Sequence, residues 1–349
     1  MFVLAIMVLF TGGGLALFAA RAGALRQGGI FAPVSREGSL VLNNILLTTA
    51  AATVLIGTLY PLFLEAITGD KISVGAPYFN ATFAPLMLPL LLAMPFGPLL
   101  AWKRGDAGGV MQKLYPALAA AAVALIVTLV MTVHGPWLAP LGLALGVWVM
   151  AGAMAEPLLR ARFGSVPLDE AWRRLTNLPR SAFGSMLAHF GIGLMVTGIV
   201  ATSAYQTERI VVMKPGATID VAGYALTFKG VAPEKGPNYS EQTGTFVVTR
   251  GGSPVTTLLP AKRVYDAPPM PTTEAGIHNS WRGDLYVVLG DPQPDGGFAV
   301  RLYFNPLVRF IWIGALVMFI GGGLSISDRR LRVGAPQRAR GASAVVPAE

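Results

Sequence analysis

Apolar segments of membrane-spanning length recur along this chain and constrain its fold more than any other feature. The composition is 53% hydrophobic and 13% charged, with a mean hydropathy of +0.57. Soluble globular proteins carry roughly 25% charged residues, so this balance indicates an integral membrane protein. A spanning helix needs about 20 apolar residues. The segments that approach this length are 1–20, 39–64, 83–102, 114–133, 137–158, 183–204 and 305–326. We therefore expect a polytopic α-helical membrane protein with about seven transmembrane helices.

The loops between these segments alternate in charge, which predicts an orientation. Arginine and lysine concentrate in 21–36, 103–113, 160–180 and the C-terminal tail, which hold 16 of them. The same side of the membrane has seven acids, including Glu37 and Glu156 at the ends of the adjoining spans, and the difference equals the whole net charge of +9. Cytoplasmic loops of membrane proteins are enriched in these residues. We therefore expect the N-terminus outside and the C-terminus inside. The distribution favours membrane lipid as the surroundings and argues against nucleic acid as a partner.

The segment 205–304 has a different pattern, which predicts β-strands. Large apolar residues alternate with smaller ones, as in a strand with one buried face, at Tyr224, Leu226 and Phe228. Two pairs of such runs, each separated by a glycine-containing turn, predict hairpins: 245–250 with 255–259, and 284–289 with 298–304. We interpret 268–273 as a loop. About 100 residues suffice for a small β-barrel or sandwich with its own core.

These patterns divide the chain into four parts. We expect six transmembrane helices in 1–204, one inserted β-rich outer domain in 205–304, a last transmembrane helix in 305–326 and a disordered tail in 327–349. The first segment lacks a basic start and a small-residue cleavage site, so we interpret it as a span and not a signal peptide. The chain has no cysteine, which excludes disulfides and thiolate metal sites.

His189 is the main candidate functional residue, because it falls near the middle of the span 183–204. Ionisable side chains at that depth are costly and mark functional sites. One interpretation is a structural histidine that bonds a neighbouring helix, and the other is an axial ligand to haem. Gly184, Gly191 and Gly193 either open space for a flat macrocycle or allow tight helix contact.

Further polar residues near the spans are weaker candidates. Asn43 and Asn44, about one turn inside a span, either bond across helices or line a site. Tyr78, in the outer loop 69–80, is an interfacial anchor or part of a platform for a flat ligand. Arg309 either snorkels to the interface or pairs with a carboxylate such as a haem propionate. The other two histidines, His134 in a turn and His278 in a surface loop, favour structural roles.

Several longer motifs carry a resemblance to a known family. They are VSREGSLVLNN (34–44), GTLYPL (57–62), SVGAPYFN (73–80), GPLLAW (97–102), TTEAGIH (272–278), GDLYVVLGD (283–291) and VRLYFNPL (300–307). In this order they resemble the CcmF/NrfE family of bacterial cytochrome c maturation, the haem lyase subunit. The resemblance extends to about Val333.

The resemblance implies a function, a cofactor and partners. The family receives haem from a periplasmic haem chaperone and attaches it to the CxxCH motif of an apocytochrome c, together with other maturation subunits of the CcmH and CcmI type. It holds a haem b in the bacterial inner membrane between two transmembrane histidines, and His189 matches the second. The outer domain is then periplasmic. Alternatives from other classes are a transporter of haem or another solute and a non-catalytic membrane scaffold.

Family members are about twice as long as this chain. The tryptophan-rich WWD segment and the first transmembrane histidine belong to their N-terminal part. We therefore expect a truncated product or one member of a split pair, with the partner haem ligand outside this chain and catalysis that needs the N-terminal half. The sequence assigns no catalytic residue.

Overall fold

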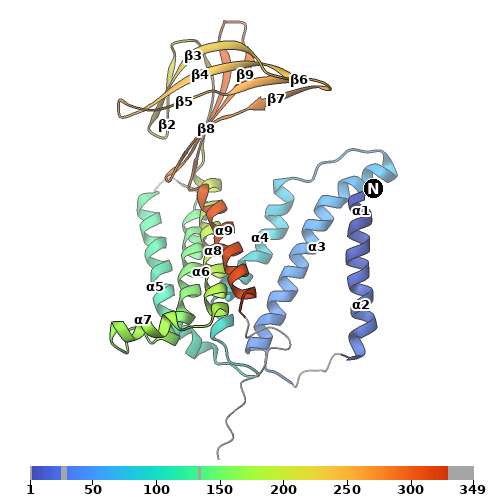
Figure 1. Ribbon diagram of the computed structural model, residues 1–349, viewed down its shortest axis with the longest axis vertical. Helices are drawn as coiled ribbons and strands as arrows, with labels where there is room; N and C mark the ends of the chain where they lie inside the picture. Colours follow the sequence, from blue (N-terminus) through green and yellow to red (C-terminus); the bar gives the residue numbers. More distant parts are fainter. Residues whose placement is uncertain (1, 25–29, 133–134, 329–349) are drawn as a thin grey trace, which may run out of the picture.

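A computed structural model describes residues 2–24, 30–132 and 135–328. It is a bundle of apolar helices with a β-sandwich at one end (Figure 1). Among the described residues, six helical segments are long and apolar enough to cross a membrane. They contain α3 (Arg36–Thr68), α4 (Ala76–Ala93) with the 3₁₀ turn η3 (Gly97–Leu99), α5 (Ala107–Met131), α6 (Ala139–Ala161), α8 (Arg180–Tyr205) and α9 (Arg309–Ile326). The expected fold class is confirmed.

The first predicted span, 1–20, forms a shorter and interrupted helix. A π-helical turn, η1 (Val8–Gly12), joins α1 (Phe2–Met7) to α2 (Gly13–Arg21), and η2 (Ala22–Ala24) follows. The apolar part of this segment is shorter than the six long spans. From Ile6 to Phe18 its large apolar side chains are mostly exposed, which is the pattern of a helix that faces lipid or another chain.

Helix α4 begins before its predicted start, inside the stretch expected to be a loop. Pro77 lies in its first turn, where the missing backbone N–H costs nothing. The ring of Tyr78 packs on Gly57 of α3, where an added Cβ would lie 2.5 Å from Tyr78 Cε1. The Tyr78 hydroxyl also donates a hydrogen bond to the carbonyl oxygen of Thr53 at 3.1 Å. These contacts with α3 favour helix where local sequence suggests a turn.

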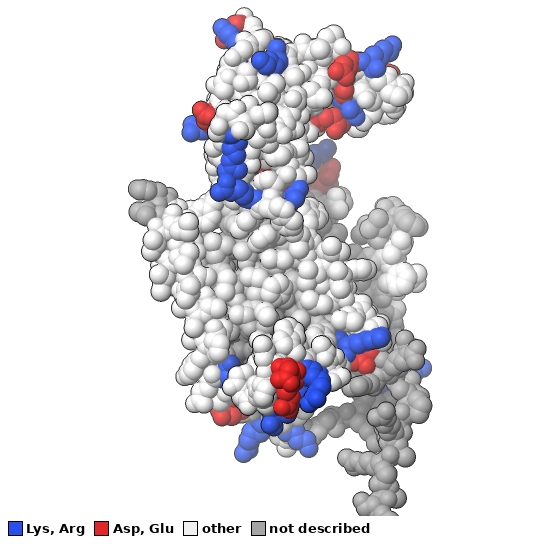
Figure 2. Space-filling view, turned by 60° about the vertical axis from the view of Figure 1, so that its left-hand side comes forward, with Lys and Arg blue, Asp and Glu red and all other residues white. Residues whose placement is uncertain are grey.

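A short helix, α7 (Leu168–Thr176), occupies the basic connection 160–180 and was not expected from the sequence. It lies across the end of the bundle away from the sandwich (Figure 1). Figure 2 shows charged side chains gathered at the sandwich and at the opposite end, with an uncharged belt between them. This distribution fits a bilayer around the belt, because exposed charge in hydrocarbon is costly.

Two antiparallel sheets form the sandwich. One has the order β1-β10-β9-β8, from the strands β1 (Thr207–Met213), β8 (Gly276–Ser280), β9 (Gly283–Pro292) and β10 (Phe298–Pro306). The other has the order β2-β3-β4-β6-β7, with β5 paired to β4. Its strands are β2 (Thr218–Val221), β3 (Tyr224–Lys235), β4 (Tyr239–Arg250), β5 (Ser253–Leu258), β6 (Ala261–Asp266) and β7 (Pro269–Glu274).

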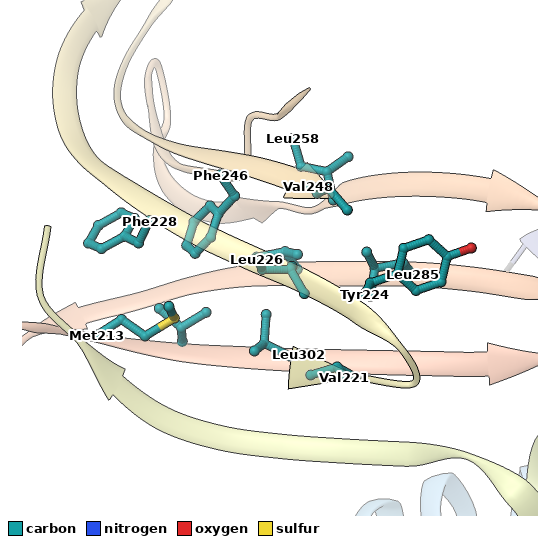
Figure 3. Close-up of a cluster of buried hydrophobic side chains, with 12 residues drawn as sticks. Met213, Val221, Tyr224, Leu226, Phe228, Phe246, Val248, Leu258, Leu285 and Leu302 are labelled. Atoms are coloured by element: carbon teal, nitrogen blue, oxygen red, sulfur yellow. The ribbon is translucent and has the colours of Figure 1, made fainter. Parts of the chain in front are cut away.

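Both predicted hairpins are present, as β4–β5 and β9–β10. The expected alternation is also confirmed, since Leu226 and Phe228 are fully buried between the sheets (Figure 3). Phe228 stacks on Phe246 with ring centroids 4.8 Å apart. The sandwich therefore has a hydrophobic core separate from that of the helical bundle.

Two local predictions for this domain are wrong. The stretch 268–273 is mostly strand, because β7 pairs with β6 at the edge of its sheet. Proline is tolerated there since the free edge needs no N–H donor. His278 lies in strand β8 and not in a surface loop, with its ring centroid 6.0 Å from that of Tyr224. His134 and the tail after Asp328 fall outside the described residues.

Candidate functional site

Glycines on two faces of α8 fix its position in the bundle. An added Cβ at Gly184 would lie 2.6 Å from the carbonyl oxygen of Gly321, and one at Gly191 would lie 2.6 Å from that of Gly314, both on α9. On another face, a Cβ at Gly193 would meet the carbonyl oxygen of Gly146 on α6 at 2.7 Å. These glycines therefore allow tight helix contact, and the space beside them is filled by protein and not left for a macrocycle.

His189 lies on a third face of α8, together with Ser185 one turn earlier. Both side chains line a hollow of about 310 Å³ between α8, α3 and α4, which we call the His189 hollow. His189 is nine positions after Arg180, or roughly 13 Å along the helix at ~1.5 Å per residue. In the described part of the chain its imidazole makes no hydrogen bond, so the interpretation of a histidine bonded to a neighbouring helix gains no support.

Helix α3 supplies the polar wall of the His189 hollow through Arg36, Ser39 and Asn43. Ser35 starts this helix, because its hydroxyl accepts a hydrogen bond from the backbone N–H of Gly38 at 3.0 Å. That cap places Arg36 in the first turn and Asn43 two turns later on the same face. Sequence reasoning counted Arg36 only as a loop charge, although the Ser35 cap before a helix-period pattern could have placed it.

Helix α4 supplies the apolar wall, and α6 holds α4 in place. The indole N–H of Trp148 on α6 donates a hydrogen bond to the carbonyl oxygen of Leu92 at 3.1 Å. Trp148 is 5% exposed and belongs to the core of the bundle. The apolar residues of the His189 hollow on α4 and the turn after it are Leu90, Ala93, Met94, Gly97 and Pro98.

The structure brings only one of the weaker candidates to His189. Asn43 lines the hollow, whereas Asn44 is exposed and accepts a hydrogen bond from Asn43 Nδ2 at 3.3 Å. The expected bonds across helices are not seen in the described residues. Tyr78 donates its hydrogen bond to Thr53 of α3 and does not line the hollow.

Arg309 lies at the junction of α9 with the sandwich. Its Nε is 3.6 Å from Asp284 Oδ1, and its guanidinium is 5.8 Å from the centre of the Trp281 ring. It therefore does not line the His189 hollow. Ile311 of α9 packs beside Gly198 of α8. Arg309, two residues before Ile311, therefore lies near the sandwich end of α8, several helical turns from His189.

Among the described residues, no group of three or more His, Asp or Glu side chains converges to bind a free metal ion. A lone imidazole suits a metal that arrives with most of its ligands, as haem iron does. Fold and site thus define a multi-pass membrane protein that carries an extramembrane β-sandwich and presents one histidine to a hollow inside its helical bundle.

Comparison with known proteins agrees with this class. The family model described as CcmF C-terminal beta-sandwich matches residues 204–306. Cytochrome c-type biogenesis protein CycK of Rhizobium meliloti is 57% identical over 344 residues, which cover 99% of this chain and 51% of CycK. CcmF of Escherichia coli is 38% identical over 340 residues, 95% of this chain and 50% of CcmF. The chain belongs to the CcmF/CycK family of cytochrome c biogenesis proteins.

A solved structure described as cytochrome c heme lyase CcmF is similar to this chain with a TM-score of 0.68 and 26% sequence identity. The similarity covers 93% of this chain and 49% of that one. The chain thus spans about half the length of the relatives it matches, and it corresponds to their C-terminal half with the β-sandwich.

Proposed function

We propose that this chain is the C-terminal portion of a cytochrome c haem lyase and that His189 is an axial ligand of a haem b within the membrane. The observation that carries the proposal is the His189 imidazole, which lines the hollow and makes no hydrogen bond in the described part of the chain. Neutral imidazole is a common axial ligand of haem iron. The partner histidine is expected in the N-terminal half, outside this chain.

The residues around the His189 hollow fit a haem. Haem is a flat apolar ring with carboxylates along one edge, and the hollow has an apolar wall from α4 and polar groups from the start of α3. When bound, haem supplies an iron centre for electron transfer and for exchange of axial ligands. His189 would hold the iron, and the contacts of α8 with α6 and α9 would fix the direction of the imidazole.

We further propose that the β-sandwich faces the periplasm and that α7 faces the cytoplasm. The loops rich in lysine and arginine lie at the end away from the sandwich, as expected for the cytoplasmic side. In this orientation the sandwich is available to a haem chaperone, apocytochrome c and other maturation subunits. Attachment of haem to the CxxCH motif is then an activity of both halves together, and the chain by itself is not proposed to be the enzyme.

Absorption spectra of membranes test the haem site. The chain is co-expressed with the N-terminal half of Rhizobium meliloti CycK, and the reduced-minus-oxidised spectrum is compared with those of the variants His189→Ala and His278→Ala. We expect the haem b bands in the wild type and in His278→Ala, and their loss in His189→Ala. Unchanged bands in His189→Ala would refute the ligand role.

A further inference from the structure

One cation faces the His189 hollow without a carboxylate partner. Arg36 is half-buried at the start of α3, and its guanidinium carbon lies 5.2 Å from the centre of the Trp102 ring. Within the described ranges, Arg36 has no carboxylate within ion-pair distance. A half-buried charge normally has a partner, because its desolvation is otherwise uncompensated. The guanidinium is thus available to an anionic group that enters the hollow.

Three other arginines near helix ends differ from Arg36 in this respect. Each has a carboxylate within 4 Å, so its charge is already compensated by the chain. The pairs are Arg160 with Glu156, Arg174 with Glu170 and Arg309 with Asp284. Arg309, the propionate partner considered from the sequence, is therefore a weaker candidate than Arg36.

Arg36 and His189 stand at different depths of the same hollow. Both α3 and α8 begin at the end of the bundle away from the sandwich (Figure 1). Arg36 lies at the first position of α3, whereas His189 is roughly 13 Å inside α8. Asn43, which lies about 10 Å beyond Arg36 along α3, reaches the depth of His189. A ligand held by His189 at its centre would extend one edge toward Arg36.

We propose that Arg36 binds the propionate carboxylates of the haem and sets its orientation, with the propionate edge toward the end of the bundle away from the sandwich. This inference rests on the proposed haem site. The planar guanidinium matches a carboxylate with two parallel hydrogen bonds. The Trp102 ring beside it limits the guanidinium to few orientations, and the Ser39 hydroxyl donates to the carbonyl oxygen of Arg36 at 2.8 Å, so the guanidinium is the donor that remains for a carboxylate.

Binding of haemin and of haemin dimethyl ester tests the role of Arg36, because the ester lacks both carboxylates. The chain, purified with the N-terminal half of Rhizobium meliloti CycK and stripped of haem, is titrated with each probe and followed by its Soret band. The variants are Arg36→Gln, Arg36→Lys, His189→Ala and Arg104→Gln. Arg104 is an exposed cation at the same end of the bundle and is not part of the hollow, so it is the matched control.

We expect Arg36→Gln to weaken haemin binding about tenfold or more, since a hydrogen bond to a charged group is lost. Its affinity for the ester should stay unchanged, and the His189-dependent Soret position should persist. Arg36→Lys should retain part of the preference for haemin, and Arg104→Gln should match the wild type.

Two results would refute the role of Arg36 without affecting the proposed haem site at His189. One is an unaltered preference for haemin in Arg36→Gln. The other is an equal loss for both probes, which would mean that Arg36 only packs on Trp102. A wild type whose spectrum does not depend on His189 overturns the proposed haem site, and the role of Arg36 with it.

Discussion

The contact between α8 and α9 gives the sharpest prediction, because two adjacent glycines of α9 have opposite surroundings. An added Cβ at Gly321 would lie 2.6 Å from the backbone nitrogen of Ala188 and 2.7 Å from the carbonyl oxygen of Gly184. A Cβ at Gly322 would have nothing within 4 Å. We therefore expect Gly321→Ala to destabilise the bundle and Gly322→Ala to leave it stable.

The size of the effect follows from the atoms involved. Both contacts of the new methyl group are with backbone of α8, which cannot rotate away, so the helices must separate. Overpacking of this kind costs about 1–3 kcal/mol. The change in helix propensity is the same at the two adjacent positions and cancels in the comparison. The difference between the two variants thus isolates the steric cost.

Thermal unfolding of the purified chain in one detergent, followed by intrinsic fluorescence, measures this difference. We expect the midpoint of Gly321→Ala to fall several degrees below that of Gly322→Ala. Because His189 lies on α8 beside Ala188, the haem b bands of membranes that also contain the N-terminal half should weaken in Gly321→Ala and not in Gly322→Ala. Equal midpoints for the two variants would refute the close contact.

Three further predictions concern the walls of the hollow and the β-sandwich. Trp148→Phe removes the hydrogen bond to Leu92 and should lower the free energy of unfolding by about 1–3 kcal/mol, measured by chemical denaturation. Phe246→Ala leaves a cavity in the sandwich core and should lower the free energy of unfolding of this domain by about 3–5 kcal/mol. Faster proteolysis of 205–304 would report this loss. A double-mutant cycle with Asp284→Asn and Arg309→Gln should give a coupling energy of about 1 kcal/mol, because these partly exposed groups lie 3.6 Å apart.

Matched controls exist for these variants. Trp312 is 74% exposed and Phe319 is 77% exposed, so Trp312→Phe and Phe319→Ala should leave stability nearly unchanged. A Trp148→Phe protein as stable as Trp312→Phe would argue against the bond to Leu92. Additive effects of Asp284→Asn and Arg309→Gln would show that their charges do not interact.

Much of the architecture could be predicted from local pattern. Apolar runs of bilayer length identify transmembrane helices, because backbone N–H and C=O groups in lipid must be hydrogen-bonded and a helix pairs them within one segment. Alternation at Tyr224, Leu226 and Phe228 predicts a half-buried strand for a similarly local reason. Even the depth of His189 follows from counting along one helix. The motifs 34–44 and 283–291 add the family, since their order carries information that composition lacks.

The candidate site depended on contacts that local pattern does not contain. Local sequence fits two roles for Gly184 and Gly191, and the packing of α9 against them selects tight helix contact. Arg309 and Tyr78 were reasonable choices by chemistry, but each has its partner elsewhere, in Asp284 and in α3.

The sequence by itself determined the membrane class, the inserted β-domain and the single histidine inside a span. These depend on hydrophobicity and periodicity, which act over neighbouring residues. Only the tertiary structure decided which groups surround His189, because helices of similar apolar composition can pack in many arrangements. Steric fit at the glycines selects one of them, and that arrangement brings Arg36 of α3 and His189 of α8 to one hollow.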